Sequence, residues 1–144
     1  MKVIIIASVL ILSMSCANSK RAQEKAMKAV LPVVLTNDFS SYARGSSDTE
    51  VTNAFLTDSI LTLNVSYSGG CKAHSFELIG SKMVQKTPQP LRGLMLIHHA
   101  NDDDCREQIK QELRFNVNEF MYKGNSTLLN LKGWAPKIEL LPKQ

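Results

Sequence analysis

The sequence lacks the short motifs that mark common catalytic and nucleotide-binding sites. It contains neither a glycine-rich phosphate loop nor a G-x-S-x-G nucleophile elbow. The acidic run at residues 102–104 lacks the spaced ligands and the glycine of an EF-hand calcium loop, so we expect a solvated turn there. The sequence also shows no internal repeat and no low-complexity tract. These absences favour a non-enzymatic protein.

The apolar run at the N-terminus is too short to span a membrane. It covers residues 3–12, whereas a transmembrane helix needs about 20 residues. Lys2 precedes the run, and residues 13–15, Ser-Met-Ser, follow it with the small-x-small pattern that signal peptidases accept. The sequence therefore predicts a cleaved signal peptide over residues 1–15 and export of the remaining chain.

Cys16 occupies the position that the cysteine of a bacterial lipobox would take. Ser15 before it fits that motif, although Ser13 stands where a strict lipobox has leucine. We expect Cys16 to be lipidated, with palmitate among its acyl chains, whose burial contributes about 0.8 kcal/mol per CH₂. Residues 16–31 then form a tether, and the protein belongs to the cell envelope with the membrane as one partner. Ordinary cleavage without lipidation is the alternative.

A large excess of charge of one sign is also missing. The formal net charge is +4, and much of the excess comes from four basic residues near the expected anchor, set against a single acid there. These residues are Lys20, Arg21, Lys25 and Lys28, with Glu24. The rest of the chain is nearly balanced, so the basic isoelectric point does not indicate nucleic-acid binding.

Residues 32–144 are expected to form one β-rich domain. Apolar side chains alternate with polar ones in several short segments, which is typical of half-buried strands. These segments include residues 61–67, 74–78, 128–131 and 138–141. Residues 91–100 are apolar on both parities, as in a central strand, and residues 36–48 have the composition of a loop. Short strands separated by turns predict an all-β fold, a small antiparallel sandwich or barrel-like domain.

The segment from Cys105 to Val117 fits two structures. Ile109 and Leu113 have helical spacing, whereas Ile109, Leu113, Phe115 and Val117 share one face of a strand that only Gln111 interrupts. We favour the strand.

Cysteine and histidine gather in one part of the domain. Apart from Cys16, the cysteines are Cys71 and Cys105, and the three histidines lie between them. The pattern is G-G-C-x2-H followed by H-H-x5-C. Residues three apart on a strand point to opposite faces, so Cys71 and His74 converge only if the chain turns between them. His98 and His99 also point to opposite faces, so only one of them could join such a site.

Three interpretations of this constellation remain open. A structural disulfide between Cys71 and Cys105 suits an exported protein and is the one we favour. A zinc or copper site built from Cys71, His74, His98 and Cys105 suits the ligand types. Free thiols with histidines satisfied by packing or hydrogen bonds are the third. The first and third require no cofactor.

This region also resembles a known group of proteins. The stretches YSGGCKAHSFEL, PQPLRGLMLIHHANDDDC and ELRFNV are similar to those of small, uncharacterised bacterial lipoproteins with a GGC-x2-H-x-F, then His, then Asp-Cys pattern. The resemblance covers residues 59–117 and implies no activity. The matching residues are Gly69, Gly70, Cys71, His74, Phe76, His98, Asp104 and Cys105.

Two functional hypotheses follow from the sequence. The first is an envelope lipoprotein that binds a protein or cell-wall partner, or serves a structural purpose, without catalysis. The second is a periplasmic metal-binding or redox protein that uses the cysteine and histidine cluster.

Overall fold

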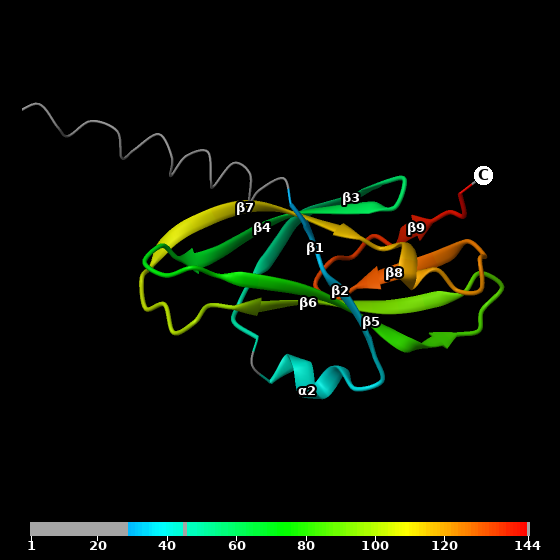
Figure 1. The fold of residues 1–144 in the computed structure, drawn as a ribbon, viewed down its shortest axis with the longest axis horizontal. Helices are drawn as coiled ribbons and strands as arrows, with labels where there is room; N and C mark the ends of the chain where they lie inside the picture. Colours follow the sequence, from blue (N-terminus) through cyan, green and yellow to red (C-terminus); the bar gives the residue numbers. More distant parts are fainter. Residues whose placement is uncertain (1–28, 45, 144) are drawn as a thin grey trace, which may run out of the picture.

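Two β-sheets packed face to face make up the computed structural model, which describes residues 29–44 and 46–143 (Figure 1). The predicted all-β fold is confirmed. The first sheet contains, in spatial order, β1 (Val30–Leu31), β7 (Glu107–Asn116), β4 (Ile60–Gly69) and β3 (Glu50–Thr57). The second contains β2 (Val33–Thr36), β5 (Ser75–Gln85), β6 (Leu91–His99), β8 (Thr127–Leu131) and β9 (Ile138–Leu140). The predicted signal peptide, Cys16 and most of the tether lie outside the described residues.

Both sheets are mixed, whereas the sequence predicted antiparallel pairing. The pairs β1–β7, β2–β5 and β6–β8 are parallel, and the remaining pairs are antiparallel. Parallel neighbours need a crossover connection. The chain supplies one between β6 and β8 because β7, which lies between them in sequence, belongs to the opposite sheet. Within the described ranges, no helix combines the length and apolar character needed to cross a membrane.

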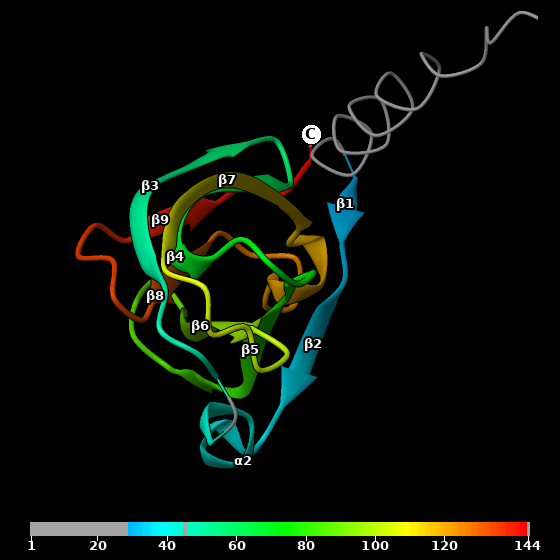
Figure 2. The same ribbon diagram turned by 90° about the vertical axis from the view of Figure 1, so that its left-hand side faces the viewer.

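The strands form a ring when the molecule is seen along its length (Figure 2). On one side, β1 and β2 follow each other directly but belong to different sheets. Pro32 separates them and has no N–H to continue a ladder, which suits the point where the chain changes sheets. On the other side, β3 packs beside β9. The domain is therefore a sandwich that is closed like a barrel.

The core fills the space between the sheets, as the period-two patterns predicted. Leu61, Leu63 and Val65 of β4 are all at most 1% exposed. Most of the segment from Cys105 to Val117 forms strand β7 (Glu107–Asn116), as favoured over the helix. Its interruption, Gln111, has a specific partner, because its side-chain oxygen accepts a hydrogen bond of 2.8 Å from the Tyr67 hydroxyl.

The prediction of a loop over residues 36–48 is wrong for part of that segment. Helix α2 (Phe39–Ala43) lies there, and Asp38 caps it by accepting a hydrogen bond from the backbone N–H of Ser41. Its apolar side chains pack on the outer face of the second sheet, which explains why β6 is apolar on both parities. The outer cluster contains Ile79, Met95 and Ile97, with Val34, Phe39, Tyr42 and Ala43 against it.

Candidate functional site

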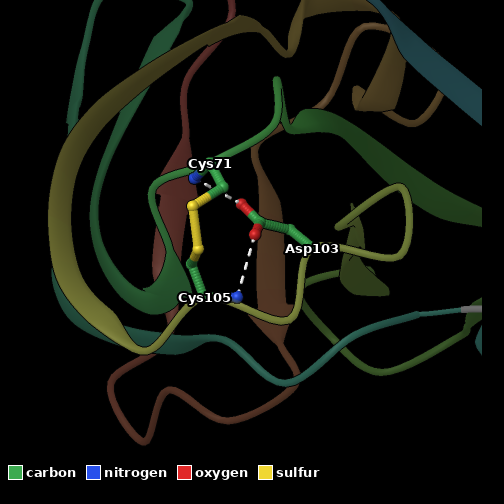
Figure 3. A group of neighbouring side chains, drawn as sticks. All are labelled: Cys71, Asp103 and Cys105. Carbon is green, nitrogen blue, oxygen red and sulfur yellow. Dashed lines mark hydrogen bonds between the residues drawn. A yellow bond between two sulfur atoms is a disulfide. The ribbon is translucent and has the colours of Figure 1, made fainter.

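Two loops meet at one end of the sandwich and are joined by a disulfide. Residues 70–74 connect β4 to β5, and residues 100–106 connect β6 to β7 (Figure 1). Cys71 of the first loop is bonded to Cys105 of the second, with their Cα atoms 5.8 Å apart (Figure 3). The predicted disulfide is confirmed.

The carboxylate of Asp103 lies between these loops and binds backbone N–H groups from both. Its Oδ2 accepts hydrogen bonds from Gly70, Cys71 and Lys72 at 2.9–3.0 Å, and its Oδ1 accepts one from Cys105 at 3.0 Å. Figure 3 shows the bonds from Cys71 and Cys105. The Asp103 side chain has no exposed surface. These bonds, above all those from the backbone of Lys72 and of Cys105, hold the pKa of Asp103 well below its usual range.

A chain of hydrogen bonds leads inward from Asp103. His74 Nε2 lies 3.0 Å from Asp103 Oδ2, and His74 Nδ1 lies 2.7 Å from His98 Nε2. His98 Nδ1 then lies 2.7 Å from Thr49 Oγ1 and 3.2 Å from the carbonyl oxygen of Asp48. We call Asp103, His74, His98 and Thr49 the histidine relay.

Aromatic rings enclose the relay on the core side. His98 stacks on Phe76, its cross-strand neighbour, with ring centroids 4.6 Å apart, and Tyr67 lies 4.8 Å from both histidine rings. His98 is only 1% exposed. Burial lowers the pKa of His98 below its ordinary value of 6.5; the Asp48 carbonyl opposes this effect and the neighbouring histidines add to it.

Two glycines permit this packing. A Cβ atom on Gly69 would lie 2.5 Å from Cε1 of His74, so only glycine lets the ring approach the end of β4 so closely. Gly70 has a φ of +116°, which side-chain-bearing residues rarely adopt. The G-G before Cys71 therefore shapes the turn that the sequence predicted.

A polar hollow of about 630 Å³ opens beside the relay. Among the described residues that line it there are three carboxylates and no lysine or arginine. The lining residues are Ser47, Asp48, Thr49, Glu50, Ser66, Tyr67, Ser68, His98, Ala100, Asp103 and Gln108. Polar groups thus surround a site whose walls are fixed by the disulfide, the Asp103 bonds and the relay.

The structure brings together most of the residues that the sequence singled out. Only one of the two adjacent histidines, His98, joins the cluster, as expected from strand parity. Both sulfur atoms are in the disulfide, so the four-ligand zinc or copper arrangement is not available to the chain in this oxidised form, and the histidine nitrogens bond to each other and to neighbours. The histidines match the third interpretation, in which hydrogen bonds satisfy them.

Sequence reasoning missed Asp103, Thr49 and Tyr67. The family resemblance pointed to Asp104, which is exposed, whereas its neighbour Asp103 makes the contacts. Three consecutive aspartates carry no signal that distinguishes one from another, and only the loop geometry selects Asp103.

Comparisons with known proteins show a fold similar to that of small β-rich proteins from the genera Bacteroides and Parabacteroides. Neither a family model nor a curated protein sequence matches the chain. Its structure is similar to a NigD-like immunity protein from Bacteroides caccae, with a TM-score of 0.57, 17% identity, and 79% of this chain and 65% of that chain covered. It is also similar to a toxin-related protein from Parabacteroides distasonis, with a TM-score of 0.53, 20% identity, and 76% and 61% covered.

A third similar structure, from Bacteroides vulgatus, is a protein of unknown function, with a TM-score of 0.50, 14% identity, and 78% and 56% of the two chains covered. At such identities the likeness shows the fold alone. The chain spans less than two thirds of the length of each of these three proteins.

Proposed function

We propose that the protein is an exported envelope lipoprotein, anchored through Cys16, that binds a partner and catalyses no reaction. The observation that carries this proposal is the polar hollow at the disulfide end of the sandwich. Its walls are covalently and electrostatically fixed, so binding there loses little conformational entropy. Membership of the lipoprotein group with the GGC-x2-H-x-F pattern belongs to the same proposal.

The partner is proposed to be a protein with a basic contact surface. Asp48 and Glu50 line the hollow and are exposed, and no lysine or arginine is among its described lining residues. Complementary charge on a partner increases its association rate and specificity. The likeness to structures described as an immunity protein and a toxin-related protein supports a protein partner over cell-wall material.

A photoreactive amino acid placed at Ser68, on the rim of the hollow, tests the binding site in living cells. We expect one discrete protein adduct, and we expect Glu50→Lys to reduce its yield severalfold because the charge complementarity is reversed. The same probe at Lys82, which is exposed near the opposite end of β5, is the control. Equal adducts from both positions would contradict a binding site at the hollow, and attachment to the cell-wall sacculus would identify the other partner class.

The anchor is tested separately. Cys16→Ser should abolish palmitate labelling and move the protein from the membrane fraction to the soluble fraction, because the acyl chains supply the membrane affinity. Cys71→Ser is the matched control, since it removes a different cysteine and should leave labelling unchanged. Continued labelling of the Cys16→Ser protein would show that lipidation occurs elsewhere.

A further inference from the structure

Hydrogen-bond acceptors lie on both sides of the two histidines of the relay. The Asp103 carboxylate accepts from His74 Nε2 at one end, and the carbonyl oxygen of Asp48 faces His98 Nδ1 at the other. Between them, His74 Nδ1 faces His98 Nε2 at 2.7 Å, a contact that holds one proton. These three contacts therefore need three ring protons, one more than two neutral imidazoles carry.

Thr49 allows the pair to exist without the extra proton. When His98 Nδ1 carries no proton, it accepts a hydrogen bond from the Thr49 hydroxyl at 2.7 Å in place of donating to the Asp48 carbonyl. The contact with Asp103 and the contact between the two rings are both kept. A second extra proton breaks the contact between the two rings. His74 Nδ1 and His98 Nε2 would then both carry a proton, so two donors would face each other. Two positive charges would also share a buried site that holds one carboxylate, Asp103.

We propose that the His74–His98 pair is an acid-operated latch on residues 46–49. The pair keeps the latch closed with no extra proton or with one, and a second extra proton drives the two rings apart and releases the segment. The latch rests on hydrogen-bond geometry and does not depend on the proposed binding function.

The latch holds a segment that is otherwise weakly attached. The backbone N–H of Ser47 donates to the carbonyl of His98 at 2.8 Å, and the backbone N–H of His98 donates to the Ser46 hydroxyl at 3.2 Å. These bonds and the ring contacts of His98 connect the segment to β6. Since Ser47, Asp48 and Thr49 line the hollow, release of the segment would also open that wall.

Other ionisable groups surround the latch. From the neighbouring strands and loops these are Tyr67 of β4, His99 of β6, Lys72 and Asp103 of the two joined loops, and Asp48 and Glu50 beside the hollow. Among the contacts described, only the Asp103 carboxylate bonds to a ring of the pair. One positive charge is thus balanced, and a second has no bonded carboxylate.

Amide exchange of Ser47 measures whether the latch is closed. In the native chain we expect the protection factor of Ser47 to fall at least tenfold on acidification, while that of Leu63 in the core stays unchanged. His99→Gln should behave like the native chain, since His99 is outside the relay. His74→Gln leaves one histidine in the contact, so Ser47 should stay protected in acid. Loss of Ser47 protection in folded His74→Gln protein would overturn the proposal.

Thr49→Val provides a second test that does not depend on how well the His74 variant folds. Valine removes the hydroxyl that donates to unprotonated His98 Nδ1 but leaves the Asp48 carbonyl as acceptor for the protonated form. The midpoint of the first protonation, followed by the ¹⁵N shift of His98 Nδ1, should therefore move to higher pH. No movement, movement to lower pH, or constant Ser47 protection throughout the native titration would each contradict the latch.

Discussion

Asp103 gives three consecutive N–H groups of the 70–72 turn an acceptor that water would otherwise have to provide. The same carboxylate orients His74 and fixes the amide of Cys105. A neutral side chain could not accept on both oxygens, because the amide of asparagine offers one acceptor and one donor group. The site therefore requires a carboxylate, with two oxygens that both accept hydrogen bonds.

Asp103→Asn should therefore destabilise the fold. Its NH₂ group would face either the N–H groups of the 70–72 turn or that of Cys105, and no orientation satisfies both. We expect the melting temperature to fall by several degrees in differential scanning calorimetry. Asp104→Asn, an exposed neighbour with the same charge change, should leave it nearly unchanged. Equal effects of the two variants would mean that the Asp103 contacts contribute nothing specific.

Gly69→Ala should also destabilise, because the new Cβ would meet the His74 ring at 2.5 Å. Overpacking of this kind costs about 1–3 kcal/mol of unfolding free energy. A double-mutant cycle with His74→Ala isolates the contact, since the alanine at 69 should cost little once the ring is gone. An unchanged cost in that background would place the strain elsewhere.

At the scale of elements, the disulfide joins the β4–β5 loop to the β6–β7 loop, each of which already runs between the two sheets. The two loops already share the Asp103 bonds, so the covalent link adds to an arrangement that hydrogen bonds also favour. Its stabilisation acts largely on the unfolded chain, whose freedom it restricts.

Replacing both Cys71 and Cys105 with serine should lower the unfolding free energy by at most about 3–4 kcal/mol, the entropy of closing a loop of roughly 35 residues. The fold should remain. Each single replacement should cost about as much as the double one, because either removes the whole bond. Urea denaturation measures all three, and single variants that each cost half of the double would show that thiol contacts, not the bond, contribute.

At the scale of the whole molecule, stability should depend on pH through His98. Its folded pKa is below its unfolded value of 6.5, so between these two values the unfolded state binds more protons. The unfolding free energy should therefore decrease as pH falls below about 6.5. Denaturation at a series of pH values should show a weaker slope for His98→Gln than for His99→Gln, and equal slopes would be inconsistent with a lowered pKa of His98.

Asp103 affects stability in a different, more acidic pH range. Its folded pKa is far below the ordinary value, so its stabilisation is complete at neutral pH and is lost only below the unfolded value of 3.8. The two residues thus produce two acid transitions, and the one at higher pH belongs to His98.

Much of the sheet structure could be predicted from the sequence. The alternation at residues 61–67 predicted which side chains of β4 face the core. The apolar pattern on both parities of residues 91–100 predicted that β6 is a central strand. Helix α2 could not be predicted, because its composition is that of a loop and it is stabilised by packing of Phe39 and Tyr42 on the outer face of the second sheet. The parallel strand pairs could not be predicted either. Period-two alternation indicates which side chains of a strand face the core, but it does not indicate which strand lies beside it or in which direction that strand runs.

The sequence by itself determined which residues face inward, the turn at Gly69 and Gly70, and the small set of cysteines and histidines from which a site could be built. Tertiary structure decided that the two cysteines pair, that His98 and not His99 joins His74, and that Asp103 is the aspartate that binds both loops. The physical reason is distance along the chain. Side-chain periodicity and turn preference act over a few residues, whereas these contacts join residues 24 to 34 positions apart, which come together only when β5 pairs with β6 and β4 pairs with β7.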